Sequence, residues 1–228
     1  MRQANVNALL KKTRAQLKAI RGEYERSLHA KQIAPELKID IKNLCENLRS
    51  ALDYIAHDIR EKHCVGANVK NPFYFPILPD SKTFADRVQK WFPGLNKTCP
   101  PLWNLLESIQ PYQVGQEWLG KFNRVNNENK HGDLVEQTRT ETHRITAKSE
   151  GSSVSWDPSA VTFRAGVSIM GVPVNPETQM PLPHSSQTIE KKIWVDFRFA
   201  DIGVSALWLL SESVSGIDAI AKRIYLVI

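Results

Sequence analysis

One pair of residues in this chain has types and a spacing that suggest a reaction. Arg124 and His131 are separated by six residues. On a helix, their side chains would lie within about 20° of each other and about two turns apart. In metal-independent RNA cleavage, a base takes the proton of a ribose 2′-hydroxyl, the oxygen attacks the phosphorus, and a cation stabilises the phosphorane. Histidine titrates near neutrality and can carry the proton. The pair therefore predicts cleavage of RNA and not of DNA, which lacks that hydroxyl.

A helix must position this pair. Apolar residues recur at the three- and four-residue spacing of one helix face. They are Trp118, Leu119, Phe122 and Val125. At about 100° per residue, Asn126 and Asn129 project onto the same apolar side, whereas Asn127 joins Arg124 and His131 on the opposite side. Arg124, Asn127 and His131 are therefore the candidate catalytic residues.

A structural role for the same helix is the alternative. Asn126 and Asn129 need partners on the apolar side, because an unsatisfied buried amide costs about 1 to 3 kcal/mol. Arg49, Asp53 and Asn47 from a preceding helix could supply them. The result would be a buried cluster of hydrogen-bonded polar side chains, a polar knot, that fixes the register between the two helices.

The most regular apolar stripe in the chain predicts that preceding helix over residues 36–62. Arg49 lies at the edge of the apolar face. Asp53 and His57 lie progressively further round the helix, towards the side that faces water. Because Arg49 and Asp53 are four residues apart, we expect an ordinary surface ion pair. Lys130, near the end of the later helix, is favoured by the helix dipole. The candidate binding residues are Arg49, Asp53, His57, Asn126, Asn129 and Lys130.

A helical chain with R-x6-H near the end of a helix resembles the HEPN superfamily, whose members carry an R-x(4–6)-H motif. The resemblance covers only the helical part of the chain. Members of this superfamily often act as dimeric ribonucleases in toxin, phage-defence and CRISPR systems. The resemblance implies that Arg124 and His131 are the catalytic pair. It also implies a homodimer in which a second copy supplies another pair across the cleft, with RNA and an antitoxin as partners.

The order of the sequence patterns predicts the α+β class. Helical periodicity covers residues 1–133 and 203–228, and alternation between 137 and 200 predicts an inserted antiparallel sheet of three or four strands. The sheet has one apolar face, which must rest on another layer, most simply the helices. We therefore expect a mainly helical bundle with the sheet inserted before the C-terminal helix. The whole, residues 1–228, would form one integrated domain.

Composition narrows the classes of function. The net charge is +6, but 24 acidic residues lie among 30 basic ones, so a polyanionic partner is permitted and not required. Three cysteines without paired spacing argue against a disulfide framework and for a reducing compartment. No apolar run has the length of a signal peptide or a membrane span. We therefore expect a cytoplasmic protein that does not enter the membrane.

Several common catalytic motifs are absent from the sequence. It contains no GxxxxGK[ST] phosphate loop, no GxGxxG after a strand, no HExxH, no paired CxxC and no GxSxG. We therefore expect no cofactor. Two other interpretations remain open. One is a non-enzymatic interaction or scaffold protein whose sheet edge or 175–186 loop binds a protein partner. The other is a metal-bound enzyme with ligands drawn from His63, Cys64, and Cys99 or His57.

Overall fold

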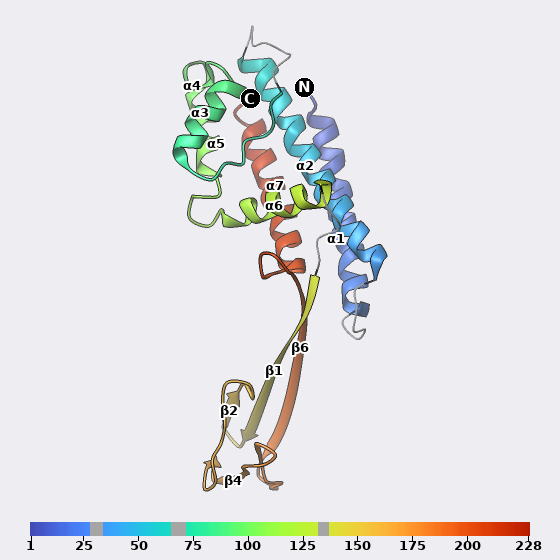
Figure 1. The fold of residues 1–228 in the computed structure, drawn as a ribbon, viewed down its shortest axis with the longest axis vertical. Helices are drawn as coiled ribbons and strands as arrows, with labels where there is room; N and C mark the ends of the chain where they lie inside the picture. Colours follow the sequence, from blue (N-terminus) through green and yellow to red (C-terminus); the bar gives the residue numbers. More distant parts are fainter. Residues whose placement is uncertain (28–33, 65–71, 132–136) are drawn as a thin grey trace. The chain divides into compact units, whose positions relative to one another are not determined.

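The chain folds into two compact units in the computed structural model, which describes residues 1–27, 34–64, 72–131 and 137–228. The helical unit comprises Met1–Thr138 and Phe197–Ile228, and the β unit comprises Arg139–Asp196. Figure 1 shows the order of the elements along the chain. The predicted α+β class, a helical bundle with an antiparallel insertion before the last helix, is confirmed. That the whole chain acts as one integrated domain stays a prediction.

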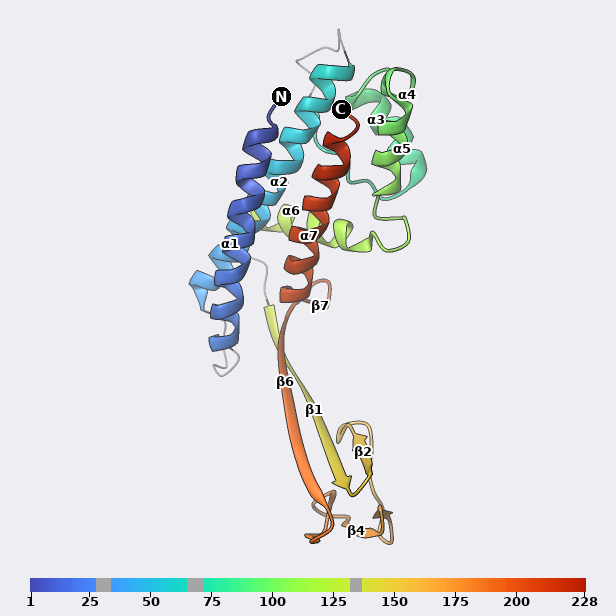
Figure 2. The ribbon, with the colours of Figure 1, turned by 180° about the vertical axis from the view of Figure 1, so that it is seen from behind.

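Three long helices form the body of the helical unit. They are α1 (Gln3–Ser27), α2 (Pro35–His63) and α7 (Ala206–Tyr225). Each packs against the other two, and the views from front and back show them side by side (Figures 1 and 2). The apolar stripe predicted for α2 is the centre of this core, since Leu44, Leu48, Leu52 and Ile55 are completely buried. The periodicity of the sequence therefore identified the central helix correctly.

Shorter helices and an extended strap complete the helical unit. The helices are α3 (Ser81–Trp91), α4 (Leu95–Thr98), α5 (Pro100–Ser108) and α6 (Glu117–His131). The strap is the proline-containing segment 72–80, which has no regular secondary structure. The buried Gln110 side chain holds it, since its Oε1 accepts from the Leu78 amide (2.9 Å) and its Nε2 donates to the Pro76 carbonyl (3.1 Å). Its prolines favour this extended backbone, because each one biases the residue before it away from the helical conformation.

Helix α6 runs across α2 and α7 and contacts both (Figure 1). At its crossing with α7, Gly216 leaves room for the Trp118 indole. A Cβ at Gly216 would lie 2.3 Å from Trp118 Cζ2, which is far inside van der Waals contact. Glycine is therefore required at this crossing for a packing reason.

We expect Gly216→Ala to destabilise the protein by about 1 to 3 kcal/mol, because the indole must move in a packed core. This loss exceeds the roughly 1 kcal/mol by which alanine otherwise favours a helix interior. Gly22 in α1 is the matched control, since a Cβ there meets nothing within 4 Å. Gly22→Ala should stabilise by about 0.5 to 1 kcal/mol. Urea unfolding measures both variants, and equal midpoints would contradict this account of the crossing.

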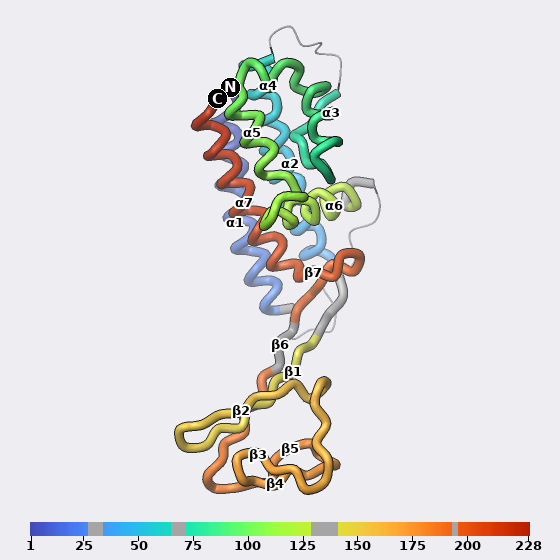
Figure 3. The backbone as a smooth tube through the Cα atoms, turned by 90° about the vertical axis from the view of Figure 1, so that its left-hand side faces the viewer, coloured from blue at the N-terminus to red at the C-terminus, as the bar shows by residue number. Residues whose placement is uncertain are grey.

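Seven strands lie among the described residues, more than the three or four predicted. One sheet has the order β2-β1-β6-β7 and the other the order β3-β4-β5 (Figure 3). The first consists of β1 (Gln137–Ser149), β2 (Ser152–Trp156), β6 (Thr188–Phe199) and β7 (Val204–Ser205). The second consists of β3 (Ser168–Ile169), β4 (Val172–Asn175) and β5 (Met180–Pro181). Strands of two residues carry too little alternation to be found from a pattern.

The β unit has a small core of its own. Ile145 and Ala147 of β1 are buried with Trp156 of β2, and they pack with Ile169 and Val174 of the second sheet. The sequence predicted that the apolar face of the sheet rests on the helices. For these side chains that prediction is wrong, because β3 and β4 supply the opposing layer.

The last residues of β6 do belong to the helical unit. Phe199 is completely buried in the helical core. The Phe197 amide donates to the Tyr24 hydroxyl of α1 (2.7 Å), and the two rings meet edge to face at 5.3 Å. These contacts attach the end of β6 to α1 within the helical unit.

Candidate functional site

Helix α6 carries the R-x6-H pair, and its observed bounds include both residues. The apolar face predicted for it is confirmed, because Trp118, Leu119, Phe122 and Val125 are all buried. The helix continues to His131. With a rise of about 1.5 Å per residue, the Cα atoms of Arg124 and His131 are about 10 Å apart along the axis. Both residues therefore belong to one continuous helix.

Arg124 and Asn127 are exposed, as predicted. The Arg124 guanidinium is not free, however, since its Nε donates to Glu128 Oε1 (2.9 Å). This bond raises the pKa of Arg124 above its ordinary value. Glu128 Oε2 is buried and has no hydrogen-bond partner. An anion that binds Arg124 must therefore compete with the Glu128 carboxylate, which the R-x6-H motif does not include.

The side chains of Asn129, Lys130 and His131 lie outside the described residues. The predicted facing of the His131 imidazole and the Arg124 guanidinium stays a prediction. So do the proposed roles of Lys130 at the helix end and of Asn129 on the core side.

Asn126 is completely buried, as its place on the apolar side predicted. Its expected hydrogen bonds do not form. Both Asn126 side-chain atoms lack a partner, and Asn47 instead donates to Gln16 of α1 (3.0 Å). A buried amide without partners costs about 1 to 3 kcal/mol. The predicted polar knot around Asn126 is therefore wrong in its partners, because the side chains of α2 meet α6 one turn earlier.

That contact is made by a cluster that we call the α2 clamp, formed by Arg49 and Asp53. Arg49 donates to Asp53 (Nε to Oδ2, 3.2 Å), to the Phe75 carbonyl (3.3 Å) and to Asn123 Oδ1 of α6 (3.3 Å). Asp53 Oδ1 accepts from the Phe75 amide (3.0 Å). Arg49 is only 8% exposed. The expectation of an ordinary surface ion pair is therefore wrong, since the strap covers the pair and the pair in turn joins α2, the strap and α6.

His57 lies two turns before the end of α2 and is exposed. Its ring meets Phe73 of the strap edge to face, with the ring centres 4.7 Å apart. The Arg60 guanidinium stacks on the same phenyl ring at 4.2 Å. These contacts give His57 and Arg60 a packing role. A binding role for His57 stays a prediction.

The described residues lack the features of a metal site and of a membrane-spanning helix. Within them, no group of three or more His, Cys, Asp or Glu side chains is arranged to hold a metal ion. None of the helices built from them has the length and apolar character needed to cross a bilayer. The three cysteines are free and buried. Burial raises the pKa of Cys45 to about 12 and that of Cys64 to about 11, so both remain protonated thiols at neutral pH.

No protein-family model matches the chain, and no curated protein or solved structure matches it either. Any assignment of function must therefore come from the chemistry of the residues.

Proposed function

We propose that the protein binds single-stranded RNA on the exposed face of α6 and cleaves it by metal-independent acid–base chemistry, as a HEPN-like homodimer. One observation carries the proposal, namely that α6 is a continuous helix through His131 with Arg124 and Asn127 exposed. The three free thiols fit a reducing, cytoplasmic compartment. The mild positive charge fits a polyanionic substrate.

Each residue has a stated part in the reaction. The His131 imidazole takes the proton of the 2′-hydroxyl, and the oxygen attacks the adjacent phosphorus. The Arg124 guanidinium and the Asn127 amide donate to the phosphoryl oxygens, where negative charge develops. The bond from phosphorus to the 5′-oxygen breaks, and an acid protonates the leaving oxygen. The His131 of a second copy supplies that acid. The products are a 2′,3′-cyclic phosphate and a 5′-hydroxyl.

Glu128 controls access to Arg124 in this scheme. The Arg124 side chain is half exposed, and ion pairs open to water on one side are weak, so a phosphate can displace the carboxylate from Arg124. The displaced carboxylate still repels the phosphate, because it stays on the same helix four residues away. Glu128 therefore lowers the affinity of this face for RNA without blocking it.

We expect Glu128→Gln to tighten binding of a 2′-O-methyl single strand, which cannot react, by about fivefold at low salt. Arg124→Ala should weaken binding and lower the slope of log affinity against log salt by about 0.7, the value for one lost contact with a single strand. Fluorescence anisotropy measures both. Arg87→Ala, an exposed arginine of α3, is the matched control and should bind like the wild type. Equal affinity and equal slope for all four proteins would remove α6 as the RNA-binding face.

A further inference from the structure

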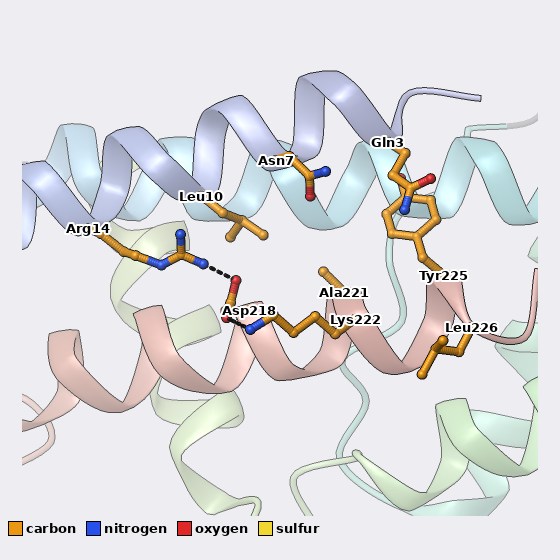
Figure 4. Close-up of a pocket in the computed structure, with 9 residues that line it drawn as sticks. All are labelled: Gln3, Asn7, Leu10, Arg14, Asp218, Ala221, Lys222, Tyr225 and Leu226. Atoms are coloured by element: carbon orange, nitrogen blue, oxygen red, sulfur yellow. Dashed lines mark hydrogen bonds and ion pairs between the residues drawn. The ribbon is translucent and has the colours of Figure 1, made fainter.

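Figure 2 shows α1 and α7 in front of α6. Residues of these two helices line an open groove. Two adjoining hollows, of about 520 and 430 Å³, make up this α1–α7 groove. They share Arg14 and Asp218 as lining residues. Figure 4 shows the larger hollow, with Arg14 and Lys222 both reaching Asp218. The two helices run antiparallel, since Arg14 bonds Asp218 and Arg21 bonds Ser211.

The floor of the groove is apolar and its rim is basic. The floor consists of Leu10, Leu17, Val214 and Ala221, each less than a tenth exposed. Leu226, 87% exposed, lines one end. The cations along the groove are Arg14, Lys18, Arg21 and Lys222. Asp218 is the single carboxylate among the lining residues, and Arg14 and Lys222 (2.8 Å) already hold it.

We propose that the α1–α7 groove binds an acidic amphipathic helix of a partner protein. An amphipathic helix places its apolar face in such a groove and its polar face at the rim. The lining residues of α1 run from Gln3 to Arg21. That span is about 27 Å long, which matches a helix of about 18 residues. The excess of cations at the rim selects acidic side chains in the partner.

Two other occupants fit the groove less well. A second copy of this chain in a two-fold arrangement would bring one basic rim against the other, and facing like charges oppose association. The groove offers RNA little surface for the base stacking that strengthens binding of single strands. Tyr225 is the single aromatic residue in the lining, and its hydroxyl is bound to Asp58 (2.8 Å). Because the groove does not use Arg124 or Asn127, the inference does not depend on the proposed ribonuclease activity.

The test uses two labelled synthetic helices of about 18 residues. They share a leucine face, and their polar positions carry glutamate in one peptide and lysine in the other. We expect the wild-type protein to bind the glutamate peptide at least about tenfold more tightly than the lysine peptide in an anisotropy titration. Lys18→Glu should reduce that binding several-fold, and so should Leu226→Asp, which removes an exposed apolar contact. Lys82→Glu, the same charge change on α3, is the matched control and should have no effect.

Some results would overturn the inference. These are equal binding of the two peptides, no binding of the glutamate peptide, or no change with Lys18→Glu and Leu226→Asp. If single-stranded RNA competes with the glutamate peptide for the wild-type protein, and Lys18→Glu abolishes that competition, the groove is an RNA site. If the wild-type protein self-associates and Lys18→Glu abolishes this, the α1–α7 groove binds a second copy of the chain. Arg124→Ala should leave peptide binding unchanged, so failure of the groove and failure of the α6 site are distinguishable.

Discussion

We expect His131→Ala to lower the rate of single-stranded RNA cleavage by about 100- to 10,000-fold, the usual contribution of a positioned general acid or base. Without the imidazole, no group of this pair titrates near neutral pH, because an arginine guanidinium remains charged. In a homodimer both copies carry the change, so each site loses its base and its acid together. The effect should therefore lie towards the upper end of that range. Gel electrophoresis of end-labelled RNA in EDTA measures the rate.

His184→Ala is the matched control for this variant. His184 is exposed and its Nδ1 lies 2.7 Å from the Ser186 hydroxyl, in the β unit. This control should cleave at the wild-type rate. If His131→Ala and wild type cleave equally, the activity does not belong to α6.

The second large effect concerns stability. Asp53→Asn should destabilise the protein by about 2 to 3 kcal/mol, because a buried guanidinium then loses its counter-charge. Arg49 keeps its bonds to the Phe75 carbonyl and Asn123, which limits the loss. The strap should loosen first, so hydrogen exchange at the Phe75 amide should accelerate more than exchange in the middle of α2.

Asp40→Asn provides the comparison, since Asp40 lies on the same helix and is exposed. Asp40→Asn should change the free energy of unfolding, measured in urea, by no more than about 0.5 kcal/mol. A loss as small for Asp53→Asn would mean that the α2 clamp does not hold the strap in place.

Local periodicity was enough to predict the helices but not what covers them. The apolar faces of α2 and α6 were identified because burial repeats every three or four residues. The spacing of Arg49 and Asp53 predicted their pairing. It could not predict their burial, because Phe75 arrives from a strap 22 residues further along the chain. Burial of such a pair depends on contacts that no local pattern contains.

The candidate site shows the same limit. Asn126 was placed correctly on the core side, but which turn of α6 meets Arg49 depends on the crossing of two helices, and Asn123 occupies that place. Glu128 could have been found from the sequence, since it stands four residues after Arg124. The α1–α7 groove could not, because its two sides are about 200 residues apart in sequence.

The chemistry proposed for α6 depends on a ribose hydroxyl, and one substrate tests that directly. The substrate is a single strand of DNA with one internal ribonucleotide, incubated with the wild-type protein in EDTA and examined by mass spectrometry. We predict one cut, on the 3′ side of the ribonucleotide, that leaves a 2′,3′-cyclic phosphate and a 5′-hydroxyl. An intact strand, cuts at deoxynucleotides, or a 5′-phosphate product would contradict the proposal.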